Sequence, residues 1–413
     1  MFARLWKRDF HSLAGGTLLI WGFCHARILP THRPEIGDRH RSRQSQPKVV
    51  PVPAGLNDLS QSIFASLGGT GLTNSLELPD SDRTCLLLVD GMGNDVIEKY
   101  GSQFPALAAM NRNQVLNSTF PSTTATALTS LSTGVMPGIH GMLGYTIRVP
   151  RSGEPGRLLN ALKWDERVDP ATWQSQPTMY ERAIENGITS SYIAAKRYEG
   201  TGFSRATLRG AHYLGANHTD DMVKYAKQAL TPARSFAYLY VNNLDNAGHN
   251  DGVGSDKWLD ALAFVDDLIS QLTAALPSGT TLFVTADHGM VNVEEKLVLG
   301  KENTLMDDVT LLGGEPRARH IYVRDGALED VKSRWDSELK EKVDIYTKAS
   351  IASFIGGEVL LDANERLGDL IVVPKCGLIL IDPTREAQEG KMIGHHGGTT
   401  SVEIEIPLLN ATN

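Results

Sequence analysis

The sequence predicts an α/β fold with a mostly parallel central sheet and helices on both faces. Three observations support this prediction. The chain has 413 residues, enough to bury a large core. Its content of 41% hydrophobic and 21% charged residues is that of an ordinary globular protein. From about Val49 onward, short apolar runs alternate with longer segments of helical periodicity, a pattern typical of parallel strands joined by helices.

Each apolar run of this pattern is a predicted strand, and each longer periodic segment is a predicted helix. The run Cys-Leu-Leu-Leu-Val at 85–89 is apolar at every position, as expected of a strand that is covered on both sides. The predicted strands are 85–89, 191–194, 236–241, 281–285, 320–323, 370–373 and 378–381. The predicted helices are 95–100, 178–186, 220–229, 257–275 and 327–342.

Residues 1–48 differ in composition from the rest of the chain. Basic residues precede a moderately apolar stretch, 13–24, that loosely resembles a secretory signal and is too short to span a membrane. Residues 27–48 are polar and rich in arginine and proline, which is typical of disorder. A disordered leader and a signal segment both remain open, and with them a cytoplasmic or an exported protein. A single domain is expected from 49 to 413.

Charge and cysteine content restrict the classes of function. The formal net charge of −8 argues against stable nucleic-acid binding, because the phosphate backbone requires a basic surface. A small phosphate substrate is still compatible, since a local cation can outweigh the global charge. Cys24, Cys85 and Cys376 form neither a disulfide framework nor a C-x-x-C motif. Any bound metal is therefore expected to be held by histidines and carboxylates.

A threonine-rich stretch between 117 and 145 contains the candidate nucleophile. Ser122 or Thr123 is a suitable N-cap, so we expect a helix that begins there and ends near Gly134. Thr124 then lies in the first helical turn, where free N–H groups and the helix dipole favour a phosphoryl oxygen. Its hydroxyl needs an activating base or metal to act as a nucleophile. Simple helix capping is the alternative interpretation of this stretch.

Acidic and histidine side chains follow several of the predicted strands. Asp90 comes directly after 85–89, and the segment after 236–241 contains Asp245 and His249, four residues apart. Asp287 and His288 follow 281–285 and are themselves followed by a glycine, so the strand has ended and both side chains can converge. Parallel sheets bind ligands at the carboxyl ends of their strands. We therefore expect these five side chains to lie close together.

A glycine-rich loop, 394–398, adds two more imidazoles, His395 and His396. Mixed carboxylate and imidazole ligands with open positions suit two divalent metals of the zinc type. Each signal is weak alone, but their joint occurrence along one chain favours a metal site over a set of unrelated turns. The remaining histidines of interest are interpreted as structural or surface residues, and His395 is grouped with them: His140, His212, His218 and His320.

These motifs resemble the alkaline phosphatase superfamily, in particular its nucleotide pyrophosphatase/phosphodiesterase-like members, over roughly 84–409. In those enzymes the nucleophile lies nine residues before a Thr-Gly pair. Counting back from Thr133-Gly134 gives Thr124, whereas Thr119 and Thr123 do not have this spacing. The segment 137–141 is similar to the family's structural Pro-x-x-His-Gly motif.

The resemblance implies two metal sites, with zinc as the expected metal. His396 is preferred over His395 as a ligand because the family pattern reads His-Gly-Gly. The nucleophile-side site would consist of Asp90, Thr124, Asp287 and His288. The second site would consist of Asp245, His249 and His396.

The resemblance also implies an activity, namely hydrolysis of phosphodiester or nucleotide pyrophosphate bonds through a phospho-threonine intermediate. The substrate would be a small phosphate ester or nucleotide, held by the backbone of Ala125 and by Tyr145, which replaces the family's asparagine donor. Three alternatives remain open. They are a phosphomonoesterase that uses Lys196, Arg197 or Arg209, a phosphonoacetate hydrolase-like enzyme that cleaves a carbon–phosphorus bond, and an inactive metal-binding homologue. The oligomeric state stays open.

Overall fold

The computed structural model describes residues 54–412, which all lie in one unit of the chain, Val50–Asn413. Its largest sheet has seven strands and confirms the predicted α/β fold with a mostly parallel sheet. From edge to edge the strands are β2 (Asn111–Asn117), β17 (Glu405–Thr412), β8 (Thr280–Thr285), β1 (Arg83–Val89), β7 (Ser235–Val241), β5 (Thr189–Ala194) and β6 (His212–Gly215). The leader predicted for residues 1–48 lies outside the described residues, so the division into leader and single domain stays a prediction.

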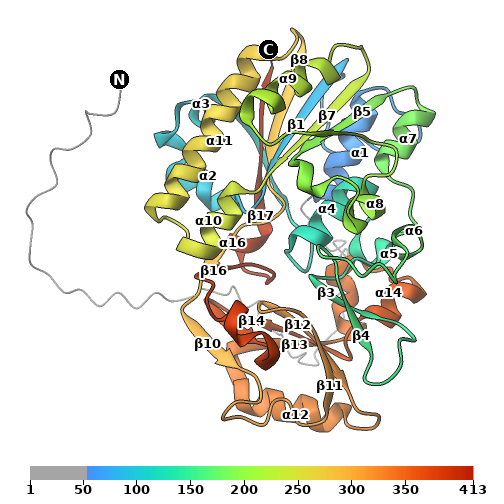
Figure 1. Cartoon of the computed structure of the whole chain (residues 1–413), viewed down its shortest axis with the longest axis vertical. Helices are drawn as coiled ribbons and strands as arrows, with labels where there is room; N and C mark the ends of the chain where they lie inside the picture. The colour runs from blue at the N-terminus through green and yellow to red at the C-terminus, as the bar shows by residue number, and fades with distance from the viewer. Residues whose placement is uncertain (1–53, 413) are drawn as a thin grey trace, which may run out of the picture. The chain divides into compact units, whose positions relative to one another are not determined.

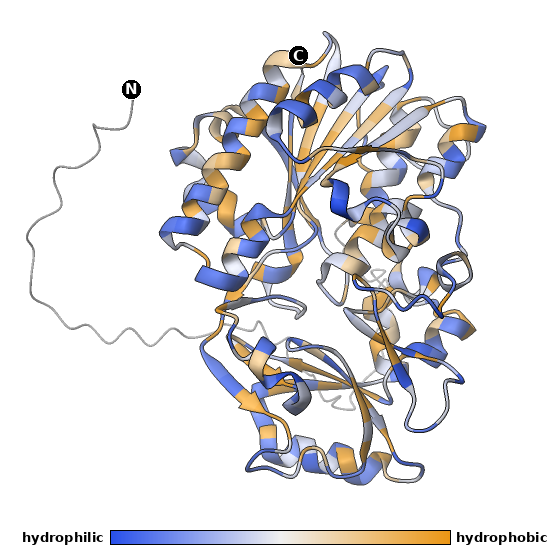
Figure 2. Ribbon diagram, viewed as in Figure 1, coloured by the Kyte–Doolittle hydropathy of each residue, from blue (hydrophilic) through white to orange (hydrophobic). Residues whose placement is uncertain are grey.

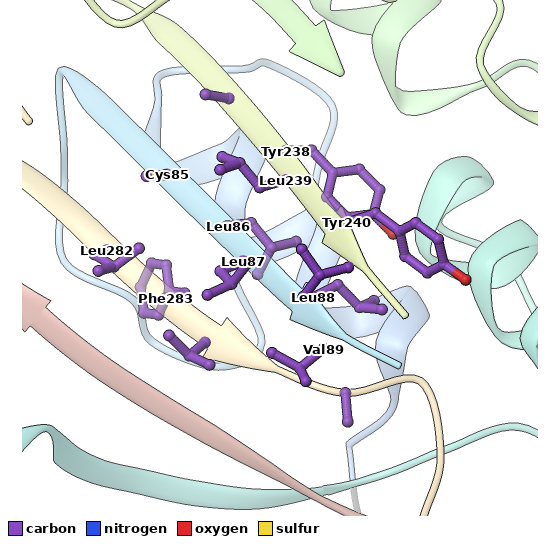
Figure 3. Close-up of a cluster of buried hydrophobic side chains, with 14 of the residues drawn as sticks. Cys85, Leu86, Leu87, Leu88, Val89, Tyr238, Leu239, Tyr240, Leu282 and Phe283 are labelled. Carbon is purple, nitrogen blue, oxygen red and sulfur yellow. The ribbon is translucent and has the colours of Figure 1, made fainter. Parts of the chain in front are cut away.

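Strand β1 lies at the centre of the sheet, parallel to β7 on one side and to β8 on the other. Val89 pairs with Val241 at the carboxyl ends of β1 and β7. Figure 3 shows Tyr238 and Tyr240 extending from the same side of β7, as the two-residue period of a strand requires. Only β17 runs against the other strands, since it is antiparallel to both β8 and β2.

Helices cover both faces of this sheet, which explains why its central strands are apolar at nearly every position (Figures 1 and 2). One group of helices is α1 (Leu56–Ser66), α4 (Thr124–Thr133), α7 (Met179–Glu185) and α8 (Gly202–Thr207). The other group is α2 (Asn94–Tyr100), α3 (Pro105–Ala109), α9 (Thr219–Ala229), α10 (Asn243–Asp251) and α11 (Asp256–Ala275). The helices predicted at 95–100, 178–186, 220–229 and 257–275 are confirmed.

Three of the predicted strands, all in the C-terminal third, lie outside the central sheet. The runs at 320–323 and 370–373 belong to a separate antiparallel sheet, and the run at 378–381 pairs with yet another strand. The four strands of the second sheet, in spatial order, are β11 (Val309–Glu315), β12 (Ala318–Val323), β14 (Leu370–Pro374) and β13 (Val343–Thr347). A short apolar run indicates a buried strand but does not specify its partner or direction.

The second sheet has its own hydrophobic core. Helix α12 (Leu328–Leu339) buries Val331, Trp335 and Leu339 against this sheet. The predicted helix at 327–342 is therefore confirmed except for its last turn, which is a 3₁₀ helix at Lys340–Lys342.

Short elements connect the two sheets. Three two-stranded pairs are β3 (Thr146–Val149) with β4 (Arg157–Asn160), β10 (Glu295–Val298) with β15 (Leu378–Ile381), and β9 (Val291–Asn292) with β16 (Gly394–His395). The short helices are α5 (Pro137–His140), α6 (Pro170–Trp173), α13 (Lys348–Ile351), α14 (Leu361–Arg366), α15 (Glu386–Glu389) and α16 (Ser401–Ile404). Within residues 54–412, none of the helices combines the length and apolarity needed to cross a membrane.

Candidate metal centre and nucleophile

Helix α4 begins at Thr124, as the sequence predicts. Thr123, the residue before it, is extended, and the helix ends at Gly134, which adopts the left-handed conformation with φ 69°. Thr124 is buried, and its Oγ1 lies 3.2 Å from Nε2 of His288. The first N–H groups of the helix have no acceptor within the helix. The Thr124 hydroxyl therefore sits beside an imidazole and a set of free backbone donors.

Two buried carboxylates converge on the same imidazole. His288 Nε2 lies 3.3 Å from Asp90 Oδ1 and 3.4 Å from Asp287 Oδ2. Asp90 follows the end of β1, and its other oxygen accepts a hydrogen bond of 2.5 Å from the hydroxyl of Tyr240. Asp287 Oδ1 accepts hydrogen bonds from the backbone N–H groups of His288 and Gly91. The structure thus brings Asp90 and Asp287 together around the His288 imidazole, which in turn contacts the Thr124 hydroxyl.

A second group contains Asp245, His249 and His396. Asp245 and His249 are one turn apart on α10, with Oδ1 and Nε2 3.4 Å from each other. His396 comes from the loop after β16, and its Nε2 lies 3.7 Å from the same Asp245 oxygen. The rings of His396 and His288 stack with centroids 3.6 Å apart, so the two groups adjoin. Asp245 also offers an oxygen within 4.8 Å of ligand atoms from Asp90 and His288, and thus lies between the groups.

Backbone carbonyls orient all three imidazoles in the same way. The Nδ1 atoms of His249, His288 and His396 lie 2.8, 3.0 and 2.9 Å from the carbonyl oxygens of Gly394, Gly289 and Ser122, respectively. A carbonyl can only accept a hydrogen bond, so each Nδ1 carries the proton and each Nε2 keeps its lone pair. This orientation presents three unprotonated nitrogens to the carboxylates, as metal-binding histidines do.

The electrostatics of the site call for a cation. Burial, followed by the charges of Asp287 and Asp245, raises the pKa of Asp90 well above its usual value, and burial also raises the pKa of Asp287. Three buried oxygens accept no hydrogen bond, namely Asp90 Oδ1, Asp245 Oδ1 and Asp287 Oδ2. Each of them lies close to a histidine Nε2 atom. Unpartnered carboxylate oxygens beside nitrogen lone pairs fit divalent metals that accept mixed ligands.

A cavity of about 600 Å³ opens onto this site and is bordered by Asp90, Thr124, Asp245, His249 and His396. Leu128 and Ser132 line it too, four and eight residues after Thr124, so the cavity follows one face of α4. Polar side chains alternate in its wall with aromatic and aliphatic ones, which include Tyr145, Tyr192, Tyr198, Phe203, Leu208 and Tyr238. The cavity can therefore hold an organic group next to the candidate nucleophile.

The two predicted substrate-binding residues have different surroundings. Tyr145 lines the cavity, and its backbone N–H donates to Glu315 Oε2 at 2.8 Å. Ala125 packs its side chain into a buried cluster with Met142 and Ile147. Only the backbone N–H of Ala125, in the first turn of α4, remains as a group that could contact a substrate.

Sequence reasoning missed Glu315 and Tyr240. Glu315 ends β11 in the second sheet and lines the cavity, and its Oε1 is buried without a hydrogen-bond partner. Burial raises the pKa of Glu315 to about 8. No local signal marks Glu315, because its strand belongs to a different sheet from the other site residues. Tyr240 could have been found from the sequence, since it lies near the end of the predicted strand 236–241, just before the segment that contains Asp245 and His249.

Several alternatives from the sequence have other contacts. The Thr119 hydroxyl donates to the carbonyl of Pro121, and among the described residues Thr119 is not part of the cavity wall. Arg209 donates to the carbonyls of Gln174, Ala206 and Gln176, which is a structural role.

The other candidate cations and His395 have the following surroundings. Arg197 stacks on the ring of Tyr198, and within residues 54–412 the cavity wall contains neither Arg197 nor Lys196. His395, interpreted from the sequence as a structural or surface residue, lies in the cavity wall with its ring 5.4 Å from that of His249.

Comparison with known proteins gives the family of the chain. The family model "Type I phosphodiesterase / nucleotide pyrophosphatase" matches residues 84–399. No curated protein sequence matches the chain. Murine ectonucleotide pyrophosphatase/phosphodiesterase 5 has a similar structure, with a TM-score of 0.62 and 17% identity over 79% of this chain and 87% of that chain.

Two further solved structures give nearly the same values. The human protein of the same name has a TM-score of 0.62, again with 17% identity over 79% of this chain and 87% of that chain. An inactive form of the murine protein in complex with AMP has a TM-score of 0.61 with the same identity and coverage. These likenesses show the fold, and the family model covers most of the chain. The chain therefore belongs to the type I phosphodiesterase/nucleotide pyrophosphatase family and is a phosphoric ester hydrolase.

Proposed function

We propose that this protein hydrolyses phosphodiester or nucleotide pyrophosphate bonds through a phospho-threonine intermediate on Thr124. One observation carries the proposal: the Thr124 hydroxyl lies at a helix start, 3.2 Å from His288 Nε2, where buried carboxylates converge. A threonine hydroxyl is a weak nucleophile by itself and needs a base or a metal to activate it. The imidazole and carboxylates beside Thr124 would hold such a metal.

The two side-chain groups would hold two divalent metals, for which zinc suits the mixed nitrogen and oxygen ligands. Asp90, Asp287 and His288 would bind one together with Thr124. Asp245, His249 and His396 would bind the other. When bound, such metals lower the pKa of the threonine hydroxyl and stabilise negative charge on the phosphate and the leaving oxygen. Two divalent cations would exceed the charge of the three aspartates by one, which favours an anionic substrate.

The chain's own groups then determine the reaction. Thr124 gives up its hydroxyl proton to solvent and attacks phosphorus in line with the leaving oxygen, so that one oxygen–phosphorus bond forms as another breaks. Water later cleaves the phospho-threonine and restores the hydroxyl. The backbone N–H of Ala125 would donate to a non-bridging oxygen, a preorganised contact worth a few kcal/mol in the transition state.

The cavity favours diesters over monoesters. A monoester carries an additional charged oxygen, which monoesterases neutralise with cationic side chains near the nucleophile. Within residues 54–412 the lysine and arginine side chains in the wall are Lys163, which is exposed, and Arg385, which lies 4.0 Å from Asp382. The aromatic and aliphatic side chains of the wall instead offer a surface for a second ester group.

Initial rates with zinc would test this proposal. The substrates are p-nitrophenyl phosphate, bis-p-nitrophenyl phosphate and the nitrophenyl ester of thymidine monophosphate. We expect faster cleavage of the two diesters, and a loss of roughly a thousandfold or more in Thr124→Ala. Thr119→Ala is the matched control, and its rate should stay within a few-fold of wild type because its hydroxyl contacts only a carbonyl.

Three results would contradict the proposal. Activity that survives in Thr124→Ala would exclude this residue as the nucleophile. Faster monoester cleavage would favour a phosphomonoesterase. A wild-type protein that binds zinc but turns over none of these esters would be a metal-binding homologue without catalysis.

A further inference from the structure

A buried ion pair lies directly behind the metal centre. Glu403 on α16 and Arg317, in the turn between β11 and β12, are both completely buried. Their contact is bidentate, with Arg317 Nε 2.9 Å from Glu403 Oε1 and Nη2 2.6 Å from Oε2. The remaining Arg317 nitrogen donates to the carbonyls of Cys376 and Leu378 at 2.5 and 2.8 Å. This pair joins the second sheet to the short helix that precedes β17.

The Glu403 carboxylate also fixes the loop that contains His396. Its Oε1 accepts a hydrogen bond of 2.8 Å from the backbone N–H of Gly398, two residues after His396. The carbonyl of Gly398 accepts from the Ser122 hydroxyl at 2.8 Å, and the carbonyl of Ser122 accepts from His396 Nδ1. Three hydrogen bonds, joined through Gly398 and Ser122, thus connect Glu403 to the imidazole.

The backbone of the same residue fixes the turn after His288. The carbonyl of Glu403 accepts a hydrogen bond of 2.9 Å from the N–H of Gly289. The carbonyl of Gly289 in turn accepts from His288 Nδ1. Glu403 therefore contacts both the loop of His396 and the turn of His288, which belong to different halves of the candidate metal centre.

The fit around Glu403 is tight. A Cβ atom at Gly398 would lie 2.8 Å from Glu403 Oε2 and 3.0 Å from Arg317 Nη2, so the loop packs directly on the ion pair. Removing the carboxylate charge would leave the Arg317 guanidinium buried without a counter-ion. The loop can hardly keep its position if this pair is disturbed.

We infer that Glu403, held by Arg317, is a positioning residue that sets the metal affinity of the site by fixing His396 and His288 relative to each other. The inference rests on the proposed function in one respect, namely that these histidines bind metal. Residues that orient metal ligands typically contribute 10–100-fold to metal affinity.

The test is direct zinc titration of full-length protein against a chromophoric chelator. Glu403→Gln should raise the zinc dissociation constant roughly 10–100-fold, while KM for the diester at saturating zinc stays close to wild type. Glu389→Gln is the matched control, because Glu389 forms a similarly buried ion pair with Arg319. It should lower the melting temperature comparably and leave the zinc affinity within a few-fold of wild type.

A second variant keeps the inference testable if Glu403→Gln fails to fold. The double variant Arg317→Met with Glu403→Leu replaces the whole pair with apolar side chains of similar volume, which proteins often tolerate. It also removes the acceptor for Gly398, so its zinc affinity should fall by a similar factor.

Two outcomes separate this inference from the proposed function. Wild-type zinc affinity in either folded variant would overturn the inference alone. A wild-type protein that binds no zinc would overturn the proposed metal centre and this inference with it.

Discussion

Two buried histidines outside the metal centre are kept neutral by their surroundings. Burial and the nearby charge of Arg366 lower the pKa of His140 to about 3. Burial, with a smaller effect of Lys348, lowers the pKa of His320 to about 4. His320 Nδ1 accepts a hydrogen bond from the N–H of Gly368, so this nitrogen is unprotonated. Protonating the ring there would break that hydrogen bond. Both residues are structural, as the sequence suggested.

His320 should make the protein sensitive to acid. Its folded pKa lies below the unfolded value of about 6.5, so the unfolded state binds more protons between these values, and stability falls as pH decreases from 6.5 towards 4. Between pH 7 and pH 5 this contribution amounts to about 2 kcal/mol. His320→Gln should lose less stability over that interval than wild type, as measured by urea unfolding at both pH values.

Metal binding by other histidines also depends on pH, so the comparison should be repeated with a chelator present. A variant that loses as much stability as wild type under both conditions would contradict a neutral, buried His320.

At the scale of elements, the ends of β1 and β8 approach α16 very closely. A Cβ atom at Gly289 would lie 1.9 Å from the carbonyl oxygen of Val402 and 3.0 Å from Cα of Gly93. One at Gly93 would in turn lie 2.8 Å from Cα of Gly289. Only glycine fits at these two positions, because a side chain there would overlap the backbone of a neighbouring segment. Two strand ends and a helix meet at this point, next to the candidate metal ligands.

Gly289→Ala should therefore destabilise the protein by about 3 kcal/mol, since the new methyl group must displace backbone atoms. Gly326→Ala is the control, because its Cβ would meet open space and only its φ of 79° is unfavourable, at a cost of about 1 kcal/mol. Urea unfolding of both variants measures the difference. Equal destabilisation would show that the approach of α16 is looser than described.

At the scale of the whole molecule, the candidate site depends on both sheets. The main sheet supplies Asp90 and Asp287, whereas Glu315 and the Arg317 that holds Glu403 come from the second sheet. Three aspartates without a bound cation oppose folding, because their buried oxygens lack hydrogen bonds. The metals are thus expected to stabilise the fold as well as the reaction.

Chelation should lower the melting temperature, and zinc should restore it. A metal present at a thousand times its dissociation constant stabilises the folded state by about 4 kcal/mol. Magnesium should restore little, because it binds imidazole poorly. Differential scanning calorimetry of Thr124→Ala provides the control, since this variant keeps the carboxylate and imidazole ligands. An unchanged melting temperature after chelation would argue against the metal centre.

The sequence by itself determined the local features of this protein. The start of α4 at Thr124, its end at Gly134 and the strand ends before Asp90 and Asp287 were all predicted correctly. Such features follow from caps, glycines and the periodicity of neighbouring residues, which act over a few positions. The resemblance to the phosphodiesterases added the family, which the match over residues 84–399 shows.

Only the tertiary structure decided which distant segments meet. In the structure, Asp245 lies between the two ligand groups, and β12 and β14 belong to a separate antiparallel sheet. Arg317 pairs with Glu403, 86 residues away. The sequence of a strand does not specify which strand it pairs with, and the sequence around a charged residue does not show whether that residue is buried. Both depend on the packing of the whole chain, because long-range contacts offset the entropic cost of ordering the chain only when many of them form together.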